Sequence, residues 1–509
     1  MLELRIIIYQ LSQEDTVITM SDETNLTLHT DFYEINMMAT YFEKNMENRH
    51  AVFEVFFRNL PFGNGYAVYA GLEHIIKYIN ELNFTDEDID YLREVTDYPE
   101  SFLEYLRNFK FKGDIRSALE GDLVFNNEPI LQVEGTLAEC QLVETAILNM
   151  INYQTLIATK ASRIRVAVGD DPLMEFGSRR AQEVSAALWG TRAAVIGGFD
   201  STSNVLAGKM FGIPISGTHA HSMVEAFGND YDAFKAYAST HHDCVFLVDT
   251  YDTLKSGVPS AIKVADEMGD KINFQGVRID SGDMAYMSKR VRELLDQAGY
   301  PDAKIYASND LDENTIASLK MQHAKIDIWG VGTKVITAFD QPALGAVYKM
   351  VSCEDENGQM IDTIKISSNA EKVSTPGKKQ VWRITDKEDG KSEGDYVTLH
   401  DEDPRKEDSI FMFHPQYTYI NKTVSNFDAR PLLQDIFVGG EQVYKQPTLK
   451  EIQAYAKSAL ASLWPEYKRE LNPEDYPVDL SQKCWDNKKK IIEKVHSYVQ
   501  KIKYGSEKK

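Results

Sequence analysis

From about residue 172 the chain repeats one pattern, in which a short apolar run leads to a polar or glycine-rich loop and then to a helical stretch. About seven such units follow one another, with the runs and loops LMEFGSRR, IGGFDSTS, IPISGTHAHS, CVFLVDTYDT, FQGVRIDSGD, KIYASNDLDE and IDIWGVGTKV. Strands that alternate with helices at this spacing indicate parallel βαβ units. The pattern therefore predicts an α/β fold whose polar residues gather just after each strand.

Clusters of polar residues after successive strands favour a (β/α) barrel, because the loops at the carboxyl ends of barrel strands form one active-site face. A doubly wound open sheet is the alternative, although no G-x-G-x-x-G motif opens the first unit. We assign the barrel-like domain to residues 156–380.

The flanking regions mix helix and strand patterns. TDFYEINMMATYF predicts a helix that begins after Thr30 or Asp31, HAVFEVFFRNLP alternates like a strand, and GLEHIIKYINEL is amphipathic with a helical period. After residue 350 turn-rich segments separate strand-like pieces, and the tail from Thr448 is mainly helical. These patterns predict an N-terminal α+β domain over 23–155, a smaller C-terminal α+β region over 381–509, and an upstream extension over 1–22.

Composition narrows the class of partner. The 509-residue chain is 43% apolar and carries a net charge of −23, which argues against binding to nucleic acid or to an anionic membrane. No apolar run approaches the roughly 18–20 residues that span a bilayer. The four cysteines lie far apart, as in reduced proteins without a zinc ribbon, so we expect a cytoplasmic protein.

The residues at the predicted strand ends suit an anionic, ribose-bearing ligand. GVGT could hold a phosphate or form a plain tight turn, the acids could hold ribose hydroxyls or a Mg²⁺-diphosphate or cap helices, and arginines could pair with carboxylate or phosphate. The loop residues are Glu175, Phe176, Arg179, Arg180, Asp200, Ser201, Ser203, Thr218, His219, His221, Asp249, Asp252, Arg278, Asp280, Ser281, Asp283, Ser308, Asn309, Asp310, Gly330, Gly332 and Thr333.

Two histidines, His219 and His221, share one of these loops. An H-x-H pair at a barrel strand end could begin a metal site, but the later loops offer no further histidine to complete the coordination shell. His241 and His242 precede their strand, which places them at the opposite end of the barrel. An active-site histidine that faces phosphates, or two structural histidines, therefore remain; we predict no protein metal site.

Eight blocks then stand in order between residues 30 and 383: TDFYEINMM, EFGSRRAQ, GGFDSTSN, GTHAHS, VRIDSGD, ASNDLDE, GVGTKV and PGKKQVWR. Together they resemble nicotinate phosphoribosyltransferase, a type II phosphoribosyltransferase. The resemblance implies synthesis of nicotinate mononucleotide and diphosphate from nicotinate and phosphoribosyl diphosphate, in NAD salvage. It also implies coupling to ATP as co-substrate, with Mg²⁺, and a histidine phosphorylated by ATP. In the family motif GT-x-A-H that histidine falls on His221, and His219 fills the variable position.

The resemblance also implies roles for individual residues. Phe176 and Tyr33 would stack on the pyridine ring, with Tyr33 coming from a second subunit of a homodimer with shared sites. Arg179 and Arg278 would pair with the carboxylate of nicotinate or with phosphate, and Asp280 would hold the ribose hydroxyls. Catalysis is expected to depend on His221, Arg278 and Asp280, and the further substrate-binding residues are Asp200, Thr218, Ser308, Asn309, Gly332 and Thr333.

Two alternatives stay open. Nicotinamide could be the base, because Asp200 matches an acid that contacts the amide in the related nicotinamide enzyme. The chain could also be a non-catalytic ligand-binding barrel protein, although such a protein has no reason to keep Arg179, His221, Arg278 and Asp280 together.

Overall fold

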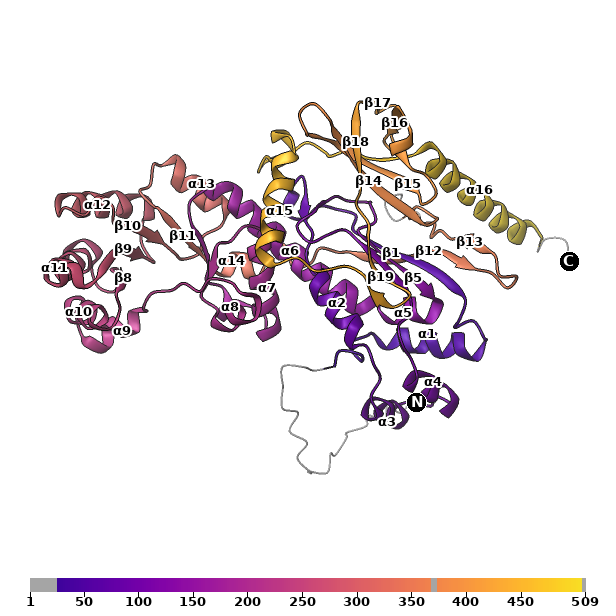
Figure 1. Ribbon diagram of the computed structural model, residues 1–509, viewed down its shortest axis with the longest axis horizontal. Helices are drawn as coiled ribbons and strands as arrows, with labels where there is room; N and C mark the ends of the chain where they lie inside the picture. The colour runs from indigo at the N-terminus through magenta and orange to yellow at the C-terminus, as the bar shows by residue number, and fades with distance from the viewer. Residues whose placement is uncertain (1–24, 368–372, 506–509) are drawn as a thin grey trace.

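The computed structural model describes residues 25–367 and 373–505, so the predicted extension over 1–22 lies outside the described residues. Figure 1 shows an elongated molecule, with a parallel sheet and its helices at one end and an antiparallel and a mixed sheet at the other. This arrangement confirms the predicted fold class, a barrel-like α/β domain flanked by N-terminal and C-terminal α+β parts.

The barrel-like sheet has six parallel strands in the order β7-β6-β11-β10-β9-β8. Its strands are β6 (Leu173–Glu175), β7 (Ser201–Thr202), β8 (Asp243–Leu247), β9 (Asn273–Ile279), β10 (Lys304–Ala307) and β11 (Ile328–Val331). The helices that follow them are α7 (Val184–Ile196), α8 (Val205–Phe211), α9 (His221–Phe227), α10 (Asp230–Thr240), α11 (Val258–Met268), α12 (Met284–Gln297), α13 (Glu313–Met321) and α14 (Thr333–Ile336). Parallel strands put all their carboxyl ends at one edge, so the predicted loops share one face.

One predicted unit forms no strand. IPIS makes only an isolated parallel bridge, between Ile215 and Thr202. Pro214 has no N–H to donate to a ladder, and the chain turns away at Ser216 and Gly217. The prediction of a strand there is therefore wrong, and the barrel is open on the side between β7 and β8.

A seven-stranded antiparallel sheet takes strands from all three predicted ranges, in the order β13-β12-β1-β5-β3-β19-β20. Its strands are β1 (His50–Phe56), β3 (Asp114–Ser117), β5 (Leu131–Thr136), β12 (Val347–Glu354), β13 (Met360–Asp362), β19 (Gln434–Val438) and β20 (Glu441–Gln442). β12 falls within 156–380 yet pairs with β1, and β19 falls within 381–509 yet pairs with β3. Strands that are remote in sequence thus pair with the edge strands of the N-terminal sheet.

The N-terminal helices follow their sequence patterns closely. α1 (Phe32–Glu43) begins after Asp31 and α2 (Leu72–Glu81) buries one face, as predicted. β1 is a strand as predicted, but it is buried at five consecutive positions and not at alternate ones. The remaining N-terminal elements are β2 (Ala67–Val68), α3 (Asp86–Val95), α4 (Glu100–Arg107), β4 (Leu123–Val124) and α5 (Leu137–Leu142).

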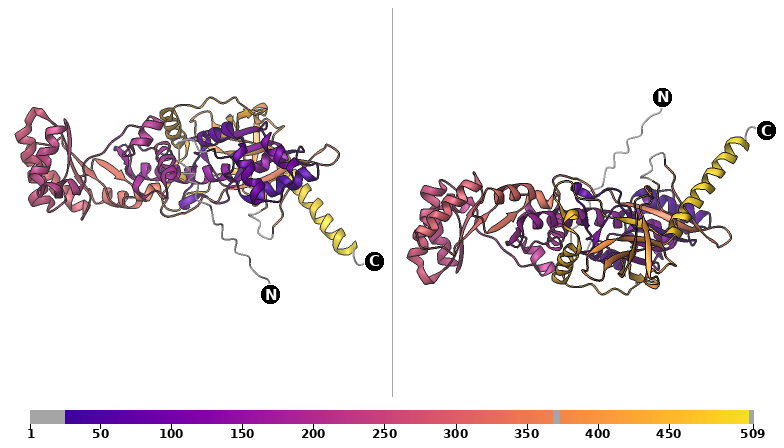
Figure 2. Two further views of the ribbon diagram at one scale, coloured as in Figure 1. Left: turned by 90° about the horizontal axis from the view of Figure 1, so that it is seen from below. Right: turned by 90° about the horizontal axis from the view of Figure 1, so that it is seen from above.

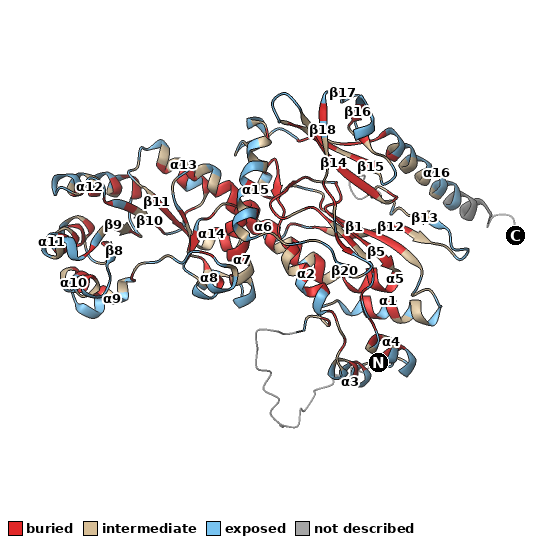
Figure 3. Cartoon of the chain, viewed as in Figure 1, coloured by how far each residue is buried: buried red, intermediate tan, exposed pale blue. Residues whose placement is uncertain are grey.

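The long helix α6 (Glu144–Val168) joins the two ends of the molecule, and Figure 3 shows it buried along much of its length. Lys160 and Arg163 each lie 2.8 Å from the carboxylate of Glu313 on α13. Because these charges are buried, the pairing ties α6 firmly to the barrel-like domain.

The C-terminal region forms a six-stranded sheet in the order β17-β16-β21-β15-β14-β18, with α15 (Leu449–Ser462) and α16 (Gln482–Gly505). The strands are β14 (Lys379–Asp386), β15 (Ser392–Leu399), β16 (Ser409–Phe413), β17 (Asn421–Ser425), β18 (Phe427–Pro431) and β21 (Val478–Leu480). Figure 2 shows α16 extending away from the body of the molecule.

Candidate functional site

The loop acids of the barrel-like domain divide into helix caps and acids at the strand ends. Asp283 and Asp312 accept hydrogen bonds from backbone N–H groups in the first turns of α12 and α13, and Asp252 does the same in the loop after β8. Asp249 and Asp280 cap no helix. Among the predicted loop acids, the alternative interpretation as caps is thus correct for Asp252 and Asp283, and it leaves Asp249 and Asp280 as strand-end candidates for chemistry.

Asp249 and Asp280 are joined by hydrogen bonds across three strand ends. The Asp280 N–H donates to Asp249 Oδ2 at 3.0 Å, and the Ser281 hydroxyl donates to the same oxygen at 2.6 Å. The hydroxyl of Ser308, which follows β10, donates to Asp280 Oδ1. The ends of β8, β9 and β10 therefore present two carboxylates in fixed positions.

His221, the first residue of α9, faces these carboxylates. Its Nε2 lies 3.7 Å from Asp280 Oδ2 and 4.0 Å from Asp249 Oδ1, and its Nδ1 lies 3.0 Å from Thr250 Oγ1. The side chain is 38% exposed, so a ligand can still reach the ring. Sequence reasoning gave no role to Thr250, which orients this imidazole, because a threonine after an acid carries no distinctive pattern.

Arg278 supplies positive charge at the same face. It is mostly buried, its NH1 donates to Thr218 Oγ1 at 2.6 Å, and its nearest carboxylate oxygen, on Asp280, is 4.0 Å away. Burial lowers the pKa of Arg278, and the positive charge of the exposed Arg179 lowers it further. Two guanidinium groups close enough to repel each other form a suitable site for an anion.

Phe176 packs between β6 and β11. Its N–H donates to the Val331 carbonyl at 2.8 Å, and a Cβ added at Gly330 would lie 2.7 Å from its ring. A Cβ added at Gly332 would lie 2.9 Å from the Phe176 carbonyl oxygen. Phe176 can therefore pack here only because positions 330 and 332 carry no Cβ. Gly332 is the N-cap residue of α14, and Thr333 is the first residue of that helix.

Glu175, which the sequence analysis counts among the loop acids, precedes Phe176 and points into the protein interior. It is fully buried, and it accepts hydrogen bonds from Gly177 N–H, from the Thr191 hydroxyl at 3.0 Å and from the Thr202 hydroxyl at 2.6 Å. Burial raises the pKa of this carboxyl. Glu175 thus anchors the turn that carries Phe176 and Arg179.

Asn309 occupies the loop after β10 in an unusual backbone conformation. Its φ is +87°, and Asp310 follows with φ of +42°, a region that L-residues other than Asn and Asp seldom adopt. Consecutive left-handed residues turn this loop sharply just after Ser308, at the same face as Asp280.

Asp200 lies elsewhere. It precedes β7, and its Oδ2 accepts hydrogen bonds from Leu173 N–H at 2.8 Å and from Arg165 at 2.7 Å. Leu173 is the first residue of β6, so Asp200 belongs to the amino-terminal ends of the strands. The carboxylate holds the start of β6, and the role of Asp200 in substrate binding stays a prediction.

Tyr33 is also remote from this face in its own chain. It is 49% exposed on α1, and Figure 1 places α1 beside the antiparallel sheets, at the other end of the molecule from β8 to β10. A Tyr33 side chain can thus complete a site only in another copy of the chain.

His219 is buried, and its Nε2 accepts the Leu247 N–H at 3.1 Å. Nε2 of His219 therefore already has a hydrogen-bond partner. His241 and His242 precede β8, so they lie at the other end of that strand. No group of three or more His, Cys, Asp or Glu side chains within residues 25–367 and 373–505 is arranged to hold a metal ion.

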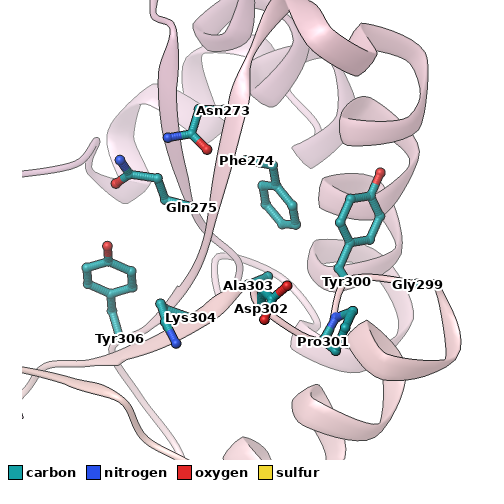
Figure 4. A pocket seen from close by; sticks show the side chains of 10 residues that line it. All are labelled: Asn273, Phe274, Gln275, Gly299, Tyr300, Pro301, Asp302, Ala303, Lys304 and Tyr306. Carbon is teal, nitrogen blue, oxygen red and sulfur yellow. The ribbon is translucent and has the colours of Figure 1, made fainter.

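Two cavities lie away from His221, Asp249 and Asp280, and one of them reaches the predicted site residue Thr333. Figure 4 shows the one at the starts of β9 and β10, with a volume of ≈ 380 Å³ and walls that include Asn273, Lys304 and Tyr306. It contains none of the predicted site residues. A larger cavity of ≈ 860 Å³ lies between α6, α7 and α14 and reaches Thr333.

Two global features bear on the expected class of partner. Among the described helices, none is long and apolar enough to cross a membrane. All four cysteines are free thiols, and three of them are buried.

Comparisons with known proteins match the chain along most of its length. Residues 28–152, 172–385 and 378–488 match the family models of the nicotinate phosphoribosyltransferase (NAPRTase) N-terminal domain, the NAPRTase family and the nicotinate phosphoribosyltransferase C-terminal domain. The chain is 57% identical to nicotinate phosphoribosyltransferase of Bacillus subtilis, covering 94% of this chain and 97% of that protein. Identity to the Caenorhabditis elegans protein of the same name is 36%, covering 90% and 92%. The structure is similar to that of human nicotinic acid phosphoribosyltransferase, with a TM-score of 0.80 at 29% identity and coverage of 91% and 99%.

Proposed function

Because the chain belongs to the nicotinate phosphoribosyltransferase family, and is an enzyme of that kind in NAD salvage, we propose that it couples phosphoribosyl transfer onto nicotinate to the use of ATP, through phosphorylation of His221. The observation that carries the proposal is the position of His221, which is accessible, held by Thr250 and faced by Asp249 and Asp280. ATP supplies the phosphoryl group when a ring nitrogen attacks its γ-phosphorus. The bond to the bridging oxygen breaks and ADP leaves, while the two carboxylates stabilise the positive charge that forms on the ring.

The transfer itself needs little acid–base chemistry. The pyridine nitrogen of nicotinate attacks C1′ of phosphoribosyl diphosphate as diphosphate leaves, so the enzyme acts mainly by holding the reactants and stabilising charge. Phe176 stacks on the pyridine ring, and Arg179 and Arg278 bind its carboxylate or a phosphate. Asp280 binds the ribose hydroxyls.

The remaining residues hold phosphates. Thr218, Ser308, Asn309, Gly332 and Thr333 line the loops that surround Asp280 and Phe176, where hydroxyl and backbone N–H groups can donate to phosphate oxygens. Mg²⁺ bound with the diphosphate would neutralise part of its charge. The Asp249 Oδ1 oxygen, buried and without a hydrogen-bond partner among the described residues, suits a cation at this place.

A homodimer with shared sites completes the proposal. Tyr33 is half-exposed and far from its own barrel-like domain, so a second copy must bring it to the ring of nicotinate. Nicotinate is favoured over nicotinamide as the base by the family match, and the hydrogen bonds of Asp200 to Leu173 and Arg165 give the nicotinamide alternative no added support.

The test is incubation of the pure enzyme with phosphoribosyl diphosphate and Mg²⁺, with nicotinate or nicotinamide, and with or without ATP. We expect nicotinate mononucleotide to form faster with ATP and little product from nicotinamide. Equal rates with and without ATP would refute the coupling, and a preference for nicotinamide would refute the substrate assignment.

A further inference from the structure

Residues 214–221 cross the open side of the barrel between β7 and β8. On the β7 side the Thr202 N–H donates to the Pro214 carbonyl at 3.0 Å, and the Ser216 N–H donates to the Thr202 carbonyl at 2.9 Å. The segment then leaves β7 without forming a strand, and it continues to His221 at the start of α9.

On the other side of the opening, β8 is an edge strand that pairs only with β9 among the described strands. The backbone of residues 214–221 does not extend the sheet there. Instead Nε2 of His219 accepts the Leu247 N–H at 3.1 Å. One imidazole therefore takes the place of a strand at the carboxyl end of β8.

The surroundings of His219 keep this imidazole neutral. Its side chain is buried beside the rings of Tyr237 and Phe234, at centroid distances of 5.1 Å and 5.7 Å. Burial, together with the positive charges of Arg278, His221 and His241, lowers the pKa of His219 to about 4. The Ala220 carbonyl is the one nearby group that favours the charged form, through Nδ1 at 3.5 Å. A neutral ring can keep Nε2 free of a proton, as acceptance from Leu247 requires.

The residues on either side of His219 belong to the candidate site. Thr218 accepts from Arg278 at 2.6 Å, and His221 contacts Thr250 at 3.0 Å. Because Thr218 and His221 lie within two residues of His219, release of His219 from Leu247 would allow both to shift.

We propose that His219 is a positioning residue, which closes the barrel on Leu247 and thereby sets the places of Thr218 and His221. Its effect on substrate binding rests on the proposed function, but the closure itself does not. His219 fills the variable position of the GT-x-A-H motif, to which the family resemblance assigns no role.

Three variants test the proposal. His219→Gln keeps an acceptor at the reach of Nε2, His219→Leu removes the acceptor, and His219→Asn keeps an amide that is too short to reach Leu247. His242→Leu is the matched control, because His242 is exposed at the opposite end of β8.

The first measurement is amide hydrogen exchange at Leu247, which needs no turnover. We expect exchange about tenfold faster in the Leu and Asn variants, since one hydrogen bond is lost, and near the wild-type rate in the Gln variant and the control. Unchanged protection of Leu247 in both the Leu and Asn variants would overturn the closure. If His219→Leu does not fold, His219→Asn decides.

The second measurement separates positioning from general stability. We expect the Leu and Asn variants to raise KM for phosphoribosyl diphosphate about tenfold, through displacement of Thr218 and Arg278, with less effect on kcat. The Gln variant should restore a near wild-type KM. Wild-type KM in all variants despite faster exchange would overturn the positioning role. A wild-type enzyme inactive with nicotinate would refute the proposed function and leave the exchange result standing.

Discussion

The Oδ1 oxygen of Asp249 is buried and lies 4.0 Å from Nε2 of His221, and no described residue donates a hydrogen bond to it. The other oxygen of this carboxylate is fully occupied by Asp280 N–H and the Ser281 hydroxyl. Burying a carboxylate oxygen without a hydrogen-bond partner costs free energy. Positive charge that develops nearby offsets this cost. The imidazole of His221 is the adjacent group that can gain such charge.

Asp249→Asn should slow phosphorylation of His221 by ATP at least about tenfold, because the neutral amide no longer stabilises the charged ring. The amide is close in shape to the carboxylate, so unfolding by urea should change little. Asp252→Asn, at a nearby capping acid, is the control. An unchanged labelling rate in Asp249→Asn would remove Asp249 from the chemistry.

His221→Asn should abolish acid-labile, base-stable labelling of the protein by [γ-³²P]ATP, together with its ATPase activity. Basal formation of the mononucleotide can persist, because glycosyl transfer needs no covalent histidine intermediate. His219→Gln, which preserves the bond to Leu247, is the matched control and should keep the label. Label that survives in His221→Asn would show that another residue is phosphorylated.

Arg278→Ala should lower kcat/KM for nicotinate or for phosphoribosyl diphosphate by an amount equivalent to about 2–5 kcal/mol, the usual cost of removing one partner from a buried charged pair. The guanidinium is mostly buried and contacts Thr218, so Arg278→Lys should recover charge without the second N–H donor. Steady-state kinetics that match the wild type for both substrates would exclude Arg278 from the site.

Tyr33→Ala should reduce only the activity of the site in the other subunit, because Tyr33 is proposed to enter that site. Mixing Tyr33→Ala with the inactive Arg278→Ala variant should recover part of the activity, because a mixed dimer holds one intact site. Mass photometry of differently tagged chains would establish that mixed dimers form. If they form and remain inactive, the sites are not shared.

Asp200→Ala should destabilise the fold without changing the choice of base. Loss of the carboxylate leaves the buried Leu173 N–H and Arg165 without this acceptor, which should cost about 1–3 kcal/mol in urea unfolding. The ratio of kcat/KM for nicotinate to that for nicotinamide should stay at the wild-type value. A changed ratio would place Asp200 in the substrate site.

The sequence predicted the elements whose patterns are local. Period-two alternation predicted β1, helical periodicity predicted α1 and α2, and the repeated run, loop and helix predicted the parallel sheet. The same regularity placed Phe176, Asp280, Ser308 and Thr333 after strands and Arg278 near the carboxyl end of β9, and parallel strands necessarily bring such residues to one edge. Similar logic failed at IPIS, where a short apolar run next to Ser216 and Gly217 looks like a strand but forms only one bridge.

Pairing between distant segments was decided only by the tertiary structure. Nothing local in β12 or β19 shows that they complete the sheet of β1 and β3, because partner choice depends on which edges remain open after the rest has packed. The same is true of single side chains. Three aspartates take different roles: Asp283 caps a helix, Asp200 accepts the N–H of Leu173 at the start of β6, and Asp249 lies against His221. Residue type and spacing determine what a side chain can do, whereas burial and neighbours in three dimensions determine which of those roles it takes.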